Sequence, residues 1–162
     1  MKPGFGPKYL EDLAVGDRNQ TASIEVTESD SIAFAERYDP QPMHTDPEAA
    51  ARGPFNGLIA SGWHTVAMVM RLMVDSHPLG SAPLLGLGVD ELRWPNPVRP
   101  GDTIQAETEV VLITPSKSKP DYGVVRLRVT ARNQRGEPVL VMTPNLWVAR
   151  RTATEKPVPI QK

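Results

Sequence analysis

Apolar and polar residues alternate along the second half of the chain. The clearest example is 125–132, where Val, Leu or Ala at every second position alternates with Arg or Thr. A period of two is typical of a β-strand with one face in the core and the other in water. Other long stretches are also rich in β-branched residues, and the pattern predicts antiparallel strands over 84–94, 103–114, 122–133 and 138–150.

The first half of the chain favours helices after a short extended run at 23–26. Thr27 is a typical N-cap, acidic residues follow it in the first turn, and apolar positions then recur at the helical period. We expect this helix to end near Tyr38, because the ring of Pro40 removes a backbone donor and clashes with the preceding turn.

Prolines dominate the segment that follows this helix. Those at positions 40 and 42 fix their own φ angles and favour extended conformations at the residues before them. We therefore expect 39–44 to be a stiff stretch that is not helical. The dipeptide Asp46-Pro47 then predicts the N-cap and first residue of a short helix that ends at Gly53.

The longest apolar segment predicts a helix from about 61 to 76. A helix that is apolar nearly all round is buried on most sides. Long antiparallel strands after such a helix favour an α+β fold in which the sheet wraps around it. The residues that follow the helical period are Ile59, Trp63, Val66, Ala67, Met70, Met73 and Val74, and Met68, Val69 and Leu72 fill much of the remaining circumference.

Length and composition indicate a single domain over 1–150 and a loose C-terminal tail over 151–162. The chain has 162 residues, of which 40% are hydrophobic, and its formal net charge is −1. Charges of both signs are scattered, which argues against nucleic-acid binding and against an anionic membrane surface. The first residues lack the apolar run of a signal peptide, and no stretch is apolar enough to span a bilayer, so we expect a cytoplasmic protein.

Two absences narrow the chemistry further. The chain has no cysteine, which excludes disulfides, thiolate metal sites and cysteine nucleophiles. Its three histidines lack the spacing of a zinc site, so no metal is expected.

Asp39 and His44 are the candidate reactive side chains. A carboxylate and a neutral imidazole are well suited to moving protons near neutral pH, and the prolines hold the two in a set relation. The alternative is that both are ordinary loop residues, with Asp39 capping a backbone amide.

Gly62 is the third candidate, since it lies at the start of the long helix. The first N–H groups of a helix have no intrahelical partner, and they can stabilise an oxygen that gains negative charge. The alternative is a glycine that merely begins the helix. Taken together, Asp39, His44 and Gly62 suggest the addition of water to an α,β-unsaturated thioester. The Asp–His pair would hold the water, and the glycine N–H would hold the enolate oxygen.

Three segments resemble the MaoC-like dehydratases, the (R)-specific enoyl-CoA hydratase family: 39–50, 57–64 and, more weakly, 92–103. The resemblance covers roughly residues 8–150. It implies a hotdog fold, a homodimer, acyl-CoA or acyl-carrier-protein thioesters as substrates, and no metal or redox cofactor. It also implies that Asp39 and His44 are catalytic and that Gly62 donates the oxyanion-hole N–H.

The chain departs from the family pattern at several positions. Arg37-Tyr38 replaces the usual Ser-Gly before the aspartate, and Gln41 replaces an asparagine. Ser61 replaces the histidine before the glycine. A helix serine that lies near the aspartate in some members falls on Met70 here, so we expect that polar support to be missing.

Two other functions remain open at this point. A thioesterase on the same fold would use the carboxylate to activate water against the thioester carbon. A non-catalytic acyl-binding subunit would bind the thioester and turn nothing over. His64, two positions after Gly62, is expected to be a satisfied helix histidine rather than a catalytic one, and basic residues such as Arg99 are assigned no role.

Overall fold

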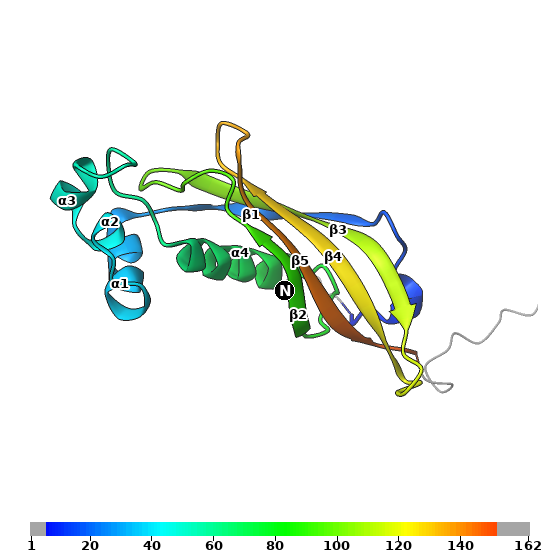
Figure 1. The fold of residues 1–162 in the computed structure, drawn as a ribbon. Helices are drawn as coiled ribbons and strands as arrows, with labels where there is room; N and C mark the ends of the chain where they lie inside the picture. Colours follow the sequence, from blue (N-terminus) through cyan, green and yellow to red (C-terminus); the bar gives the residue numbers. More distant parts are fainter. Residues whose placement is uncertain (1–5, 152–162) are drawn as a thin grey trace, which may run out of the picture.

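The computed structural model describes residues 6–151. One curved antiparallel sheet packs against a long helix, α4, and three shorter helices gather at one end of the molecule (Figure 1). Met1–Phe5 and 152–162, which include nearly all of the predicted tail, lie outside the described residues. The helices are α1 (Glu28–Tyr38), α2 (Pro42–Thr45), α3 (Pro47–Ala51) and α4 (Gly62–Ser76), with a short 3-10 turn, η1, at Leu10–Asp12.

The sheet has five strands in the order β1-β3-β4-β5-β2, and every neighbouring pair is antiparallel. The predicted strands are confirmed to within a residue or two at each end. The early extended run is longer than predicted, since it begins at Arg18 and pairs with β3 along its length. The strands are β1 (Arg18–Glu25), β2 (Leu85–Arg93), β3 (Thr103–Pro115), β4 (Tyr122–Arg132) and β5 (Pro138–Ala149).

Helix α4 is confirmed, but the predicted buried stripe is partly wrong. Its buried side runs through His64, Thr65, Met68, Val69, Leu72 and Met73. Trp63, Met70 and Val74 of the predicted stripe are instead 58%, 43% and 48% exposed. A helix that is apolar nearly all round has no single preferred side, so its periodicity cannot tell which side meets the sheet.

The segment after α1 contains one helix more than expected. Thr27 caps α1 by accepting the Asp30 N–H, and the helix ends at Tyr38 as predicted. The expectation that 39–44 is not helical is wrong from Pro42 onward, because a proline at the first helical position lacks only an N–H that would be unpaired anyway. This extra turn, α2, carries His44.

Helix α3 begins as the sequence predicts. The Asp46 carboxylate accepts the backbone N–H groups of Glu48 and Ala49, and Pro47 is the first helical residue. Only Asp46 separates α2 from α3, and together with α1 these short helices form a compact cap at one end of α4 (Figure 1).

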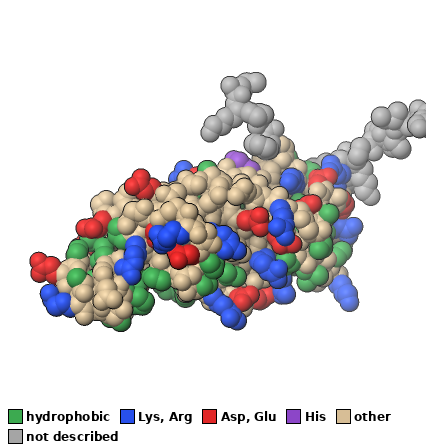
Figure 2. Space-filling view, turned by 90° about the horizontal axis from the view of Figure 1, so that it is seen from above, with side chains coloured by type: hydrophobic (Ala, Val, Ile, Leu, Met, Phe, Trp, Pro, Cys, Tyr) green, Lys and Arg blue, Asp and Glu red, His purple; other side chains and the backbone are tan. Residues whose placement is uncertain are grey.

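Charged side chains of both signs are interspersed over the face shown in Figure 2. Among the described residues, no helix combines the length and the apolar character needed to cross a membrane.

Candidate functional site

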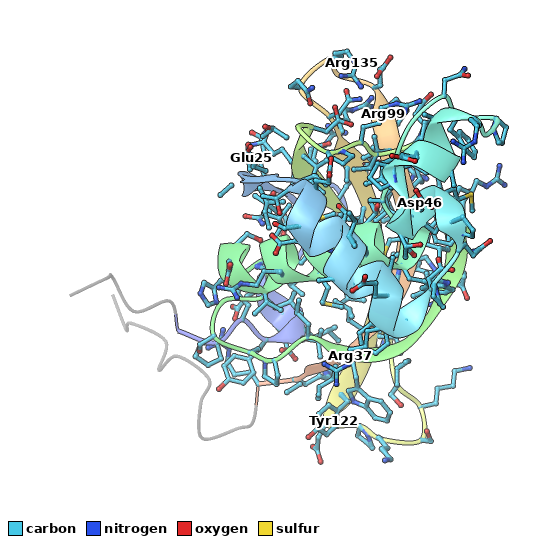
Figure 3. All side chains as sticks on the ribbon, turned by 90° about the vertical axis from the view of Figure 1, so that its left-hand side faces the viewer. Glu25, Arg37, Asp46, Arg99, Tyr122 and Arg135 are labelled. Atoms are coloured by element: carbon cyan, nitrogen blue, oxygen red, sulfur yellow. The ribbon has the colours of Figure 1, made fainter. Side chains whose placement is uncertain are left out.

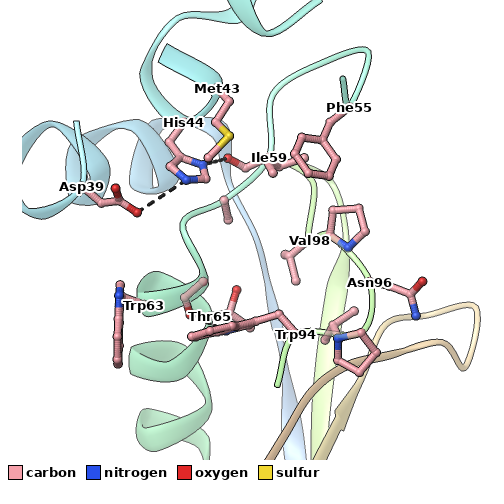
Figure 4. Close-up of a pocket in the computed structure, with 15 residues that line it drawn as sticks. Asp39, Met43, His44, Phe55, Ile59, Trp63, Thr65, Trp94, Asn96 and Val98 are labelled. Carbon is pink, nitrogen blue, oxygen red and sulfur yellow. Dashed lines mark hydrogen bonds and ion pairs between the residues drawn. The ribbon is translucent and has the colours of Figure 1, made fainter. Parts of the chain in front are cut away.

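A cavity of about 420 Å³ lies where the N-terminus of α4 meets α2 and the loop after β2 (Figure 4). Asp39, His44 and Gly62 all line it. The structure therefore brings the three predicted site residues to one cavity, although they lie on three different elements.

His44 is fixed by a hydrogen bond to the backbone. Its Nδ1 lies 2.8 Å from the carbonyl oxygen of Ile59, and its side chain is only 5% exposed. A carbonyl oxygen can only accept, so Nδ1 carries the hydrogen. In the neutral ring, Nε2 therefore presents its lone pair, and it faces Asp39 Oδ2 at 3.5 Å.

Asp39 lies at the C-cap of α1, and both of its carboxylate oxygens accept hydrogen bonds. Gln41 Nε2 donates to Oδ1 and Ser61 Oγ donates to Oδ2, each at 2.7 Å. These two donors, Gln41 first and then Ser61, outweigh the opposing effect of burial and lower the pKa of Asp39 below its ordinary value of 3.8. The side chain is thus held as a carboxylate with a defined orientation.

Ser61 corrects the expectation that the aspartate lacks polar support. Met70, at the position of the family's helix serine, is exposed, but the hydroxyl of Ser61 reaches Asp39 instead. In the sequence, Ser61 stands out only as a departure from the family pattern. A signal was present, because serine directly before a helix is a typical N-cap, yet nothing in the sequence pointed from this cap to Asp39.

Gly62 is the first residue of α4, and the space beside it is filled by Trp94. A Cβ added at Gly62 would lie 2.7 Å from Cε2 and 2.9 Å from Nε1 of that indole. The indole N–H also donates to the Gly62 carbonyl oxygen at 2.9 Å. Only glycine fits here without displacing Trp94, a contact between distant parts of the chain that sequence analysis missed.

The remaining walls of the cavity are largely apolar. The rings of Trp63 and Trp94 meet edge to face, with centroids 5.7 Å apart. The other apolar wall residues are Met43, Phe55, Ile59, Ala60, Pro95, Pro97, Val98 and Val139. Such a lining suits a hydrocarbon chain next to a small set of polar groups.

Loop contacts hold part of this wall in place. The guanidinium of Arg99 donates to the carbonyl oxygen of Phe55 at 2.6 Å. The buried Asp102 carboxylate accepts the Arg99 backbone N–H and the side chains of Gln134 and Arg135. Arg99 and Arg135 accordingly lie at the same end of the molecule (Figure 3).

His64 does not line the cavity. Its ring stacks on Phe34 of α1 with centroids 4.8 Å apart, and burial lowers its pKa. The expectation of a satisfied histidine is wrong for Nδ1, which is buried without a hydrogen-bond partner among residues 6–151. Within the same residues, no three His, Asp or Glu side chains come together as a metal site requires.

An antiparallel sheet that wraps around one long helix defines the hotdog class of proteins, and the cavity at the helix N-terminus is suited to acid–base chemistry. Residues 13–133 match the family model of the MaoC like domain. The chain belongs to the MaoC-like dehydratase family, and it is accordingly a hydro-lyase; both predictions are confirmed.

Known relatives agree with this assignment. The chain superposes with a TM-score of 0.82 on the crystal structure of a MaoC-like dehydratase from Rhodospirillum rubrum, at 50% identity, covering 89% of this chain and 98% of the other. It is 31% identical over 120 residues to 3-hydroxybutyryl-CoA dehydratase of Methylorubrum extorquens, covering 74% of each chain. It is 33% identical over 101 residues to 3-hydroxyacyl-thioester dehydratase Z of Mycobacterium tuberculosis, covering 60% of this chain and 67% of the relative.

Proposed function

We propose that this protein hydrates trans-2-enoyl thioesters to (R)-3-hydroxyacyl thioesters, or catalyses the reverse dehydration. The observation that carries the proposal is the pairing of two fixed acceptors: Asp39 Oδ2 and His44 Nε2 face each other at 3.5 Å on the wall of an apolar cavity. Each of the two is locked by separate hydrogen bonds. Neither needs to reorganise when a substrate arrives.

The pair is suited to holding one water molecule. A carboxylate oxygen and an imidazole lone pair both accept, so water between them donates both of its hydrogens and keeps its own lone pair free. That lone pair attacks the β carbon of the enoyl group while one member of the pair takes a proton from the water. That same proton is then delivered from the pair to the α carbon, so the water supplies both the hydroxyl group and the hydrogen that are added, and Asp39 and His44 end in their starting protonation states. One C–O bond and one C–H bond form, and the C=C double bond becomes single.

Gly62 supplies the remaining element of the mechanism. As electrons move toward the thioester carbonyl, its oxygen gains negative charge. The N–H of Gly62 and the positive end of the α4 dipole stabilise that charge. Ser61 uses its own hydroxyl to cap the Trp63 N–H, so the cap does not compete for the Gly62 N–H.

The substrate class follows from the cavity and from the relatives. The apolar walls suit an acyl chain, and the named relatives act on 3-hydroxyacyl thioesters and 3-hydroxybutyryl-CoA. We propose a thioester of CoA or of acyl-carrier protein as substrate. The cytoplasmic location expected from the sequence stays a prediction.

We also propose that the chain forms a homodimer through α4 and β2. β2 is an edge strand of the sheet, so one row of its backbone groups has no neighbouring strand within residues 6–151. Val89 of β2 is 51% exposed, and Met70 and Val74 of α4 are exposed as well. A second copy of the chain would cover this apolar surface.

Incubation with crotonyl-CoA tests the proposed reaction. Loss of the enoyl absorbance without release of free thiol indicates hydration, whereas free thiol indicates a thioesterase, and binding without turnover indicates an acyl-binding subunit. Asp39→Asn is expected to lower the rate by roughly two to four orders of magnitude. Asp75→Asn makes the same chemical change on an exposed ion pair of α4 and serves as the control. Near-normal turnover in Asp39→Asn would refute the assignment.

A further inference from the structure

We propose that Ser61 is a positioning residue for Asp39, whose hydroxyl ties the N-cap of α4 to the carboxylate. This hydrogen bond fixes the position of the Asp39 carboxylate relative to the start of α4, where the Gly62 N–H lies. The effect of this hydrogen bond on catalysis rests on the proposed hydratase function. The hydrogen bond itself can be detected without turnover, through the pKa of Asp39.

The direction of both Ser61 hydrogen bonds is fixed by chemistry. Ser61 Oγ lies 2.7 Å from Asp39 Oδ2 and 3.2 Å from the backbone nitrogen of Trp63. An ionised carboxylate only accepts and an amide N–H only donates, so the hydroxyl gives its one proton to Asp39 and accepts from Trp63. The residue is 0% exposed, so water does not compete for either bond.

The oxygen that Ser61 holds is the one that faces the imidazole. Oδ2 accepts from Ser61 and lies 3.5 Å from His44 Nε2, whereas Gln41 donates to Oδ1. A carboxylate held at one oxygen can still rotate about its Cβ–Cγ bond, but one held at both oxygens cannot. Without Ser61, therefore, the oxygen that faces the water site loses its anchor.

This arrangement explains how the chain functions without the family's helix serine. The side chain at that position, Met70, has no donor to offer. Ser61 provides one from the N-cap itself, two turns earlier on the helix. The length of 2.7 Å is that of a charge-assisted O–H···O bond, the stronger kind.

Ser61→Gly isolates this role, since glycine is tolerated at an N-cap but has no hydroxyl. We expect kcat to fall about tenfold to a hundredfold, as loss of one hydrogen bond to a charged group implies. KM should change less than kcat. Removing a donor raises the pKa of Asp39, so the acid limb of the pH–rate profile should move to higher pH. Ser61→Thr keeps the hydroxyl, so its kcat and the acid limb of its pH–rate profile should be close to those of the unmodified protein.

Thr27→Gly is the matched control, because Thr27 caps α1 by accepting the Asp30 N–H and does not line the cavity. Thr27→Gly should lower Tm by about as much as Ser61→Gly does, because each variant loses one N-cap, but it should leave the pH–rate profile unchanged. In an Asp39→Asn background, Ser61→Gly should cause little further loss of rate, because a residue that acts through Asp39 has nothing left to position. Independent, multiplicative losses would overturn the proposal.

A carboxyl titration separates this proposal from the proposed function. The pKa of Asp39 is measured by 13C NMR, with its signal assigned from Asp39→Asn. If the unmodified protein hydrates no enoyl thioester, the hydratase function fails, and the titration still tests Ser61. If the pKa of Asp39 is unchanged in Ser61→Gly, the proposed role of Ser61 is refuted, even if the protein hydrates enoyl thioesters.

Discussion

Replacing Gly62 by alanine tests the packing at the entrance of α4. The new methyl carbon would lie 2.7 Å from Trp94 Cε2, well inside ordinary contact, and it would push the indole away from the Gly62 carbonyl. Overpacking of this kind costs about 1–3 kcal/mol. Loss of the indole hydrogen bond adds about 0.5–1.5 kcal/mol. Alanine has a better helix propensity than glycine, which offsets at most about 1 kcal/mol of this cost, so we expect a net loss of about 0.5–4.5 kcal/mol in the free energy of unfolding.

Urea denaturation followed by tryptophan fluorescence measures this loss. The matched experiment makes the same substitution in a Trp94→Ala background, where the indole that the methyl group would meet is gone. There Gly62→Ala should cost close to nothing, and the difference between the two backgrounds gives the steric coupling. Equal losses in both backgrounds would show that glycine is needed for some reason other than Trp94.

Two further predictions concern stability and assembly. Asp102→Asn should lower the free energy of unfolding by about 1–3 kcal/mol, because the buried carboxylate accepts three hydrogen bonds, one from Arg135. The pKa of Asp102 lies below its ordinary value of 3.8, so this stability is present above that pH and is lost as the pH falls through the folded-state pKa; wild type and variant should converge in acid denaturation series. Met70→Glu should convert the proposed dimer to monomer in analytical ultracentrifugation, whereas Leu112→Glu, at a similarly exposed position on β3, should not; a dimeric Met70→Glu contradicts the proposed interface.

Much of the fold could be predicted because its signals are local. Strict alternation in β4 and the cap at Thr27 depend only on neighbouring residues, and both are confirmed. The two prolines of this segment predict a break in the helix, whereas Pro42 in fact stands at the first position of α2, where a proline is tolerated. The orientation of α4 depends on what packs against it, which no local pattern contains.

The candidate site divides in the same way. Asp39, His44 and Gly62 were found because residue type and spacing suggested their chemistry, and they line one cavity. The contact between Trp94 and Gly62 joins residues far apart in the chain, and the hydrogen bond from Ser61 to Asp39 depends on how α1 and α4 meet. Tertiary packing sets distances of this kind, so the spacing of the residues along the sequence does not predict them.

The cavity takes the proposed reacting groups from the first half of the chain and a large part of its apolar wall from the second half. Every group to which we assign a proton or a charge falls within 39–62, on the short helices or at the start of α4, whereas Trp94, Val98 and Val139 come from the sheet and its loops. If the proposed function holds, we expect substitutions at Val98 or Val139 to reshape the space for an acyl group without moving Asp39 or His44. On the proposed function, such a division would let one arrangement of Asp39, His44 and Gly62 serve acyl groups of different size through changes in the opposing wall alone.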